Sequence, residues 1–255
     1  MKTTAELSFP LTNEGFLNVL SNSFQSFVES GTSRSTSKLK PLHGAIAHDI
    51  ATYLKNDDSY SIQSQGWGDD KEGDIVGRYV DKKVDVTIYH TDKKTKKRKA
   101  VAGIAVKFVM QNYSQNSNNY FENMLGETAN IRANKCPYFQ VFIILDRLPY
   151  YKKDTKRITK WEHFTAHNAA KYVALSKDNT DMYMHTPNKT LLYVVHVPNN
   201  DDLLDKTAGE YMSYYRQCKE PIVLSEETYE NFGDSIILND YTTFIEKVYH
   251  TILAL

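Results

Sequence analysis

Two charged residues within otherwise strand-like segments are the strongest candidates for chemistry. Asp85 lies in the alternating segment 83–89, and Lys107 lies near the end of the nearly continuous apolar run 100–109. A lysine is expensive to bury unless a partner compensates its charge. A cluster of carboxylate, metal ion and phosphate would compensate it. A direct ion pair between Lys107 and Asp85 at the strand end would do so as well, and the sequence leaves both alternatives open.

The segments that position these residues change from helical to strand periodicity. Helices are expected at residues 13–30 and at about 41–55, 119–133, 160–176, 205–218 and 241–255. Strands are expected at 60–65, 83–89, 100–109, 138–145, 190–197 and 235–238. This order predicts an α/β fold in which helices flank a mixed central sheet.

An acid on the second strand and a lysine on the third, followed by a helix and another strand, resembles the PD-(D/E)XK nuclease superfamily. This superfamily includes most type II restriction endonucleases, and the resemblance covers about residues 40–146. It implies a restriction-endonuclease-like core in which Asp85 binds a divalent cation such as Mg²⁺ and Lys107 is the catalytic lysine. In phosphodiester hydrolysis the cation would activate water and neutralise the phosphate, while the lysine would stabilise developing charge.

The second acid of this motif is absent from its usual position, which Ala105 occupies. Either the acid has migrated to the following helix, as in one subgroup of restriction enzymes, or alanine has replaced a native acid and the chain is inactive. Glu122 follows Lys107 by fifteen residues and fits the migrated spacing, whereas Glu127 is a weaker candidate on the opposite flank. Glu72 is a candidate third metal ligand. The alternative for each glutamate is a solvated surface position.

Polar and basic segments near the expected site could contact DNA. Amide side chains are concentrated in residues 111–119, and such groups can pair with adenine or hold phosphates. The alternative is a helix cap with an Asx-rich turn. Basic stretches at 93–99 and 152–160 suit phosphate contacts or solvated loops. The candidate DNA-binding residues are Arg34, Lys38, Lys97, Gln111, Asn112, Gln115, Asn116, Asn118 and Asn119.

The bulk composition limits the class of protein. The 255 residues include 31 basic and 31 acidic residues, and this balance argues against a polycationic binder. Cys136 and Cys218 form no metal-binding pattern. No leader peptide or membrane-spanning run is evident, so we expect a cytoplasmic protein without a membrane partner. We expect a single domain over 1–255, with a helical extension at 1–38, a core at 39–150, and recognition and dimerisation elements at 151–255.

The leading hypothesis is a site-specific endonuclease that cuts double-stranded DNA with Mg²⁺. A homodimer is expected, because two-fold symmetric DNA sites are matched most simply by two-fold symmetric proteins. One alternative is a nonspecific nuclease effector of an anti-phage or repair system. Another is a catalytically dead relative that only binds DNA, which the alanine at position 105 would explain.

Overall fold

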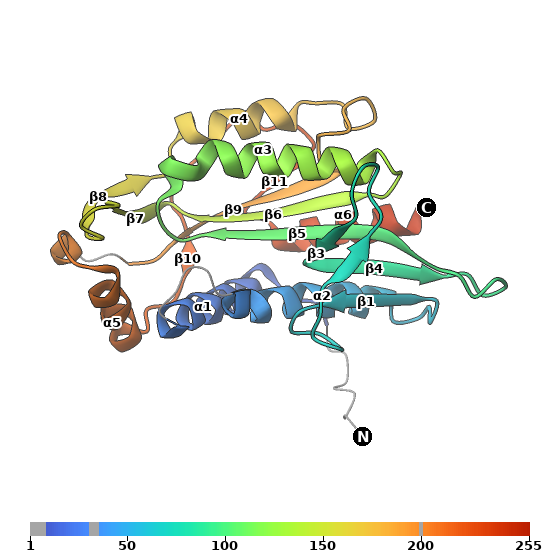
Figure 1. Ribbon diagram of the computed structural model, residues 1–255, viewed down its shortest axis with the longest axis horizontal. Coiled ribbons are helices and arrows are strands. Elements are labelled where there is room, and N and C mark those ends of the chain that lie inside the picture. Colours follow the sequence, from blue (N-terminus) through green and yellow to red (C-terminus); the bar gives the residue numbers. More distant parts are fainter. Residues whose placement is uncertain (1–8, 31–35, 199–200) are drawn as a thin grey trace, which may run out of the picture.

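The apolar, β-branched segments of the chain pair into one central sheet. The computed structural model describes residues 9–30, 36–198 and 201–255, and in this part of the chain seven strands pair in the order β1-β4-β5-β6-β9-β10, with β11 also on β9. Neighbours are antiparallel from β1 to β5 and parallel from β5 to β9. The predicted mixed sheet is therefore confirmed (Figure 1). The strands are β1 (Tyr60–Ser64), β4 (Val86–Thr91), β5 (Arg98–Val109), β6 (Tyr138–Leu145), β9 (Lys189–His196), β10 (Val223–Leu224) and β11 (Ile236–Leu238).

Helices cover both faces of this sheet (Figure 1). Helices α1, α2 and α6 pack together on one face, α3 and α4 lie on the other, and α5 packs against α1. None of the helices in the described ranges has the length and apolar character needed to span a bilayer. The helices are α1 (Asn13–Ser30), α2 (Lys40–Leu54), α3 (Tyr113–Arg132), α4 (Ala166–Ser176), α5 (Ala208–Cys218) and α6 (Tyr241–Leu253), with short 3-10 helices η1 (Thr36–Leu39) and η2 (Asp201–Leu203).

Strand β6 lies at the centre of the core. All eight of its residues are buried, because β5 and β9 flank it and helices cover both of its faces. Helix α1 contributes Phe16, Leu20 and Phe24 to the same core, each with no exposed surface. Their spacing of four residues places them on one stripe of the helix. Helix α1 is thus part of the main core and not an appended element.

The segment 83–89 divides into two strands at Asp85. Strand β3 (Lys82–Val84) pairs with β2 (Gly73–Ile75) in a small separate sheet, whereas β4 begins at Val86 and joins the central sheet. Asp85 is therefore the residue at which the chain passes from one sheet to the other. The sequence pattern indicated one continuous strand, because alternation persists across the junction.

The prediction of a helix over 160–176 was wrong in its first part. Strands β7 (Arg147–Tyr151) and β8 (Ile158–His163) form an antiparallel hairpin, and α4 begins only at Ala166. The basic stretch after residue 151 forms the turn of this hairpin. Charged residues on its exposed face conceal the alternation that marks a strand, and cross-strand backbone bonds with β7 decide the structure.

The amide-rich run after β5 is helical where a loop was expected. Helix α3 starts at Tyr113, six residues earlier than the predicted start at about residue 119. Asn112 precedes it in the left-handed region, with φ of 51°. The Asn112 side chain donates to the Tyr151 carbonyl at 3.0 Å and accepts from the Tyr151 N–H at 2.9 Å. The β7–β8 hairpin thus fixes the turn that begins the helix.

Candidate active site

Asp85 is held in place by hydrogen bonds to both neighbouring strands. Its Oδ2 accepts from the Val106 N–H of β5 at 2.7 Å, and its carbonyl accepts from the Ser64 hydroxyl of β1 at 2.7 Å. The side chain keeps 26% of its surface exposed. The carboxylate is therefore fixed beside β5 with one oxygen still available.

The surroundings of Asp85 favour its neutral form. Burial raises the pKa of Asp85 to about 6, the Val106 N–H opposes this, and the negative charge of Glu127 adds to the increase. The positive charge of Lys107 opposes it weakly. A further positive charge near Asp85 would favour its ionised form. A buried carboxylate whose charge is disfavoured by a neighbouring carboxylate suits a cation site.

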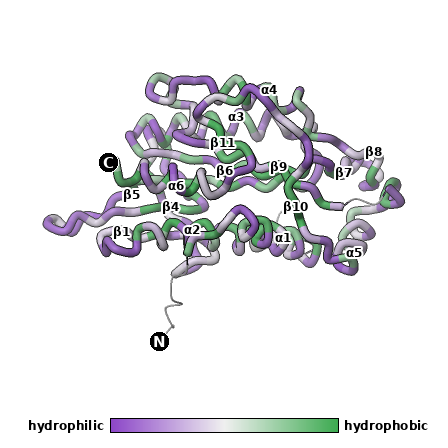
Figure 2. Tube along the Cα trace, turned by 180° about the vertical axis from the view of Figure 1, so that it is seen from behind, coloured by the Kyte–Doolittle hydropathy of each residue, from purple (hydrophilic) through white to green (hydrophobic). Residues whose placement is uncertain are grey.

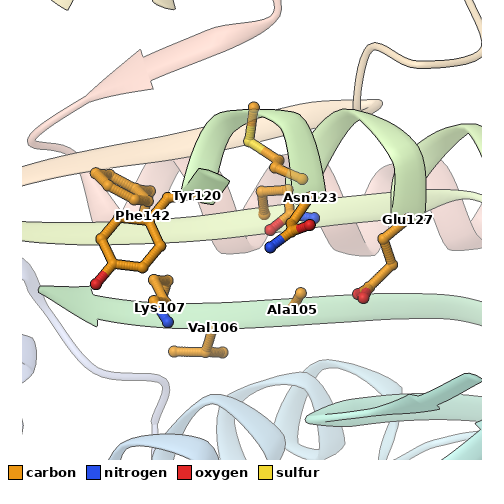
Figure 3. Close-up of a pocket in the computed structure, with 9 residues that line it drawn as sticks. Ala105, Val106, Lys107, Tyr120, Asn123, Glu127 and Phe142 are labelled. Carbon is orange, nitrogen blue, oxygen red and sulfur yellow. The ribbon is translucent and has the colours of Figure 1, made fainter. Parts of the chain in front are cut away.

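Lys107 projects from β5 toward helix α3. Its Nζ lies 4.5 Å from the centre of the Tyr120 ring (Figure 3). Burial of part of the side chain lowers the pKa of Lys107, and Asp85 opposes this change. Lys107 and Asp85, both in the part of the chain that the structure describes, form no direct ion pair. The Lys107 ammonium group packs over the Tyr120 ring instead. The ion-pair alternative from the sequence is therefore not what the structure contains.

A cavity of about 150 Å³ lies between β5, β6 and α3. Ala105 and Lys107 are two residues apart on β5 and therefore line the same face. Figure 3 shows Ala105 between Lys107 and Glu127, with Asn123 above it. An acidic side chain at position 105 would thus extend into this cavity. Its lining residues are Ala105, Val106, Lys107, Tyr120, Asn123, Met124, Glu127, Gln140 and Phe142.

Glu127 is the glutamate of α3 that lines this cavity. It accepts a hydrogen bond from the Tyr138 hydroxyl and pairs with Lys82 at 3.1 Å. Glu127 follows Met124 by three residues, Asn123 by four and Tyr120 by seven. This helical spacing places it on the face of α3 that meets the sheet. That pattern in the sequence, rather than the distance from Lys107, could have identified it.

Glu122 lies elsewhere on the same helix. It is exposed and lines an open groove of about 510 Å³ outside this cavity, and Glu127 also lines that groove. Burial lowers the pKa of Lys171 in α4, and the charge of Glu122 opposes that change. The structure therefore brings Glu127 together with Ala105 and Lys107 and leaves Glu122 outside their cavity.

His43 of α2 approaches Asp85 from the opposite side. Its Nε2 lies 3.8 Å from Asp85 Oδ1, and the ring is 2% exposed. Burial lowers the pKa of His43 to about 4, with Glu72 opposing, so the ring is neutral at pH 7. Neither ring nitrogen has a hydrogen-bond partner among the described residues. Glu72 accepts from Gln65 Nε2 at 3.0 Å and lies near enough to act on His43.

The donor groups of the cavity suit a hard divalent cation. Among the described residues no three His, Cys, Asp or Glu side chains gather closely enough to hold an ion by themselves. Glu127 lines the cavity with a carboxylate, and Asn123 and Gln140 line it with side-chain amides. The Asp85 carboxylate lies next to its wall, on the Val106 N–H. Mg²⁺ is commonly held by one or two carboxylates together with waters and substrate phosphates. The residues present therefore fit Mg²⁺.

Most of the amide residues expected to contact DNA lie near one end of α3. Asn112 is committed to Tyr151, and Gln115 donates to the Tyr150 hydroxyl at 2.9 Å, so both hold the β7–β8 hairpin. Asn118 and Asn119 are exposed on the helix. Their positions leave them open to a ligand, whereas Asn112 and Gln115 have a structural role.

The remaining candidates divide into three places. Gln111, Asn116 and Lys38 line a second cavity that also includes Lys107. Lys97 is exposed in the hairpin between β4 and β5, whose tip is hydrophilic in Figure 2. Arg34 lies outside the described residues.

The chain matches no known family model, no curated protein and no solved structure. Its function is therefore inferred from the chemistry of its own site.

Proposed function

We propose that the protein is a Mg²⁺-dependent endonuclease that hydrolyses phosphodiester bonds in double-stranded DNA at specific sites. The observation that carries this proposal is a cavity lined by Lys107 of β5 and Glu127 of α3, with the Asp85 carboxylate hydrogen-bonded to Val106 in its wall. The order and directions of β1, β4, β5 and β6, with α3 between β5 and β6, support a restriction-endonuclease-like core. Glu127 takes the role of the acid that the motif lacks at Ala105.

Each residue of this site has a separate task. Asp85 and Glu127 would hold the cation, which supplies positive charge to the pentacoordinate phosphate. Lys107 donates hydrogen bonds to a phosphate oxygen or to the attacking water, and its partial dehydration strengthens those bonds. The Val106 N–H fixes the Asp85 carboxylate, and Tyr120 holds the Lys107 side chain in position.

Sequence specificity and a homodimer remain parts of the same proposal. Basic hairpin tips extend from the sheet at β4–β5 and from β7–β8, and both suit contacts with phosphates. Two copies related by a two-fold axis would present two such sites to a symmetric DNA sequence.

One observation favours a second candidate function, a DNA-binding relative without catalysis. Ala105 faces the cavity at the position where the motif has an acid. If Glu127 does not replace that acid, the cation site has one carboxylate fewer. The fold and the basic hairpins would still bind DNA.

Incubation of supercoiled plasmid with the protein and Mg²⁺ tests the proposal, with EDTA and the Lys107→Met variant as controls. Discrete fragments that require Mg²⁺ and Lys107 support a site-specific endonuclease. A smear supports the nonspecific alternative. Absence of cutting by folded wild-type protein with either Mg²⁺ or Mn²⁺ contradicts the enzyme and leaves the DNA-binding relative.

A further inference from the structure

A second cavity lies beside the catalytic cavity and shares Lys107 and Tyr120 with it. It has a volume of about 210 Å³. Helix α1, the short helix η1 and the chain between β5 and α3 form its other walls. Two stretches that are distant in the sequence, one with Phe27 and Lys38 and one from Lys107 to Tyr120, therefore meet at this cavity.

Lys38 is an unusually buried lysine in the wall of this cavity. Only 8% of its surface is exposed, and its Nζ lies 5.0 Å from the centre of the Phe27 ring. Burial, and then the positive charge of Lys107, lower the pKa of Lys38 to about 8. Lys38 is therefore still mostly protonated at neutral pH, and two ammonium groups that repel each other line one space.

The lining of this cavity suits an anion. Lys38 and Lys107 contribute ammonium donors, and Gln111 and Asn116 contribute side-chain amides. None of the described residues that line it is acidic. An anion between two partly dehydrated lysines would relieve their repulsion and accept charge-assisted hydrogen bonds. Lysines and amide side chains are the groups that proteins commonly use to hold phosphates of nucleic acids.

We propose that the cavity between Lys38 and Lys107 binds a phosphate group. Its assignment to DNA rests on the proposed nuclease function: the group would be a backbone phosphate next to the one that is cut. Inorganic phosphate offers the same chemistry without DNA. Lys107 belongs to both cavities, so one lysine would contact the bound phosphate and the reacting phosphate.

Two probes, both used in EDTA, separate these sources. Binding of inorganic phosphate is measured by thermal melting at matched ionic strength. Binding of a short duplex DNA is measured by fluorescence anisotropy. Lys38→Met removes the charge and keeps an apolar stem to pack on Phe27. Lys40→Met is the matched control, since it removes a nearby exposed lysine that pairs with Asp70 at 2.6 Å. A cooperative melting transition of Lys38→Met in chloride is the control that this variant folds.

Phosphate is expected to raise the melting temperature of the wild type and of Lys40→Met but not of Lys38→Met. Lys38→Met is also expected to bind the duplex about tenfold more weakly and to lower the slope of log affinity against log salt by about one. If phosphate stabilisation needs Lys38 and duplex affinity does not, the cavity takes free phosphate. Equal phosphate stabilisation of wild type and Lys38→Met, or no response of the wild type to either probe, overturns the proposal.

Failure of the nuclease proposal gives a different result. The wild type would then leave plasmid uncut with Mg²⁺, while its phosphate stabilisation would still depend on Lys38. Conversely, cutting by the wild type combined with unchanged phosphate and duplex binding in Lys38→Met would retain the nuclease and overturn the phosphate cavity.

Discussion

Asp85 accepts a hydrogen bond at 2.7 Å from the backbone N–H of Val106, the residue immediately before Lys107. This bond fixes the carboxylate to the strand that carries the lysine. The two charged groups therefore keep their relative position without any bound ion. Such preorganisation is what a site needs if its charges are to act on a developing transition state.

Asp85→Asn is expected to increase the free energy of unfolding at pH 8 in the absence of metal. The pKa of Asp85 in the folded protein, about 6, is above the ordinary value of 3.8. The folded state therefore favours the protonated carboxyl, and stability falls as the pH rises from about 4 to about 6. The difference between these pKa values corresponds to a loss of at most ~3 kcal/mol in the free energy of unfolding. The asparagine side chain can still accept the hydrogen bond from the Val106 N–H.

Thermal melts in EDTA at pH 4.5 and pH 8 measure this effect. The stabilisation by Asp85→Asn should be fully present at pH 8 and fall to about a third of that value at pH 4.5. Asp69→Asn, at an exposed position, should change stability by less than about 0.5 kcal/mol at both values. If Asp85→Asn is no more stable than wild type at pH 8, ionisation of the Asp85 carboxyl does not lower the stability of the folded protein.

Stabilisation by Mg²⁺ is expected to depend on pH through the same carboxyl group. Protons compete with the cation for Asp85, so the rise in melting temperature on addition of Mg²⁺ should be small at pH 5 and grow as the pH passes about 6. Asp85→Asn should remove most of this rise. An equal rise at pH 5 and pH 8, or one that persists in the variant, would place the cation elsewhere.

Ala105→Glu tests whether the catalytic cavity still has room for the acid of the motif. Ala105 faces the same cavity as Glu127. If Glu127 fills that role, a third carboxylate adds repulsion, and the rate of plasmid cleavage should fall by about tenfold. Ala105→Ser, which adds no charge, should cut within about threefold of wild type. Gain of cutting in Ala105→Glu from an inactive wild type would instead identify the alanine as an inactivating substitution.

Asn112→Ala is expected to destabilise the protein by about 1–3 kcal/mol. Asn112 has a positive φ and makes two hydrogen bonds to the backbone of Tyr151. Asn118→Ala, at an exposed position of the same helix, should change stability by less than about 0.5 kcal/mol. Chemical denaturation measures both. Equal stability of the two variants would show that Asn112 has no structural role, and it would remain only a candidate for DNA contact.

The sequence predicted the parts of the molecule that depend on local periodicity. The alternation around Asp85 and the apolar run before Lys107 correctly indicated neighbouring strands. Spacing from Lys107 favours Glu122 over Glu127, whereas the face that α3 turns to the sheet decides which acid enters the cavity. The burial of Lys38 was not predictable, because lysine is rarely buried and its site is built by distant segments.

The most direct test compares plasmid cleavage by Glu127→Gln and Glu122→Gln with that of the wild type in Mg²⁺. Both variants lose one negative charge from the same helix, but of the two glutamates only Glu127 lines the proposed catalytic cavity. We expect Mg²⁺-dependent cutting by the wild type, a loss of about 10²-fold or more in Glu127→Gln, and a rate within about threefold of wild type in Glu122→Gln. Normal cutting by Glu127→Gln, or no cutting by the wild type, would contradict a nuclease site built from Asp85, Lys107 and Glu127.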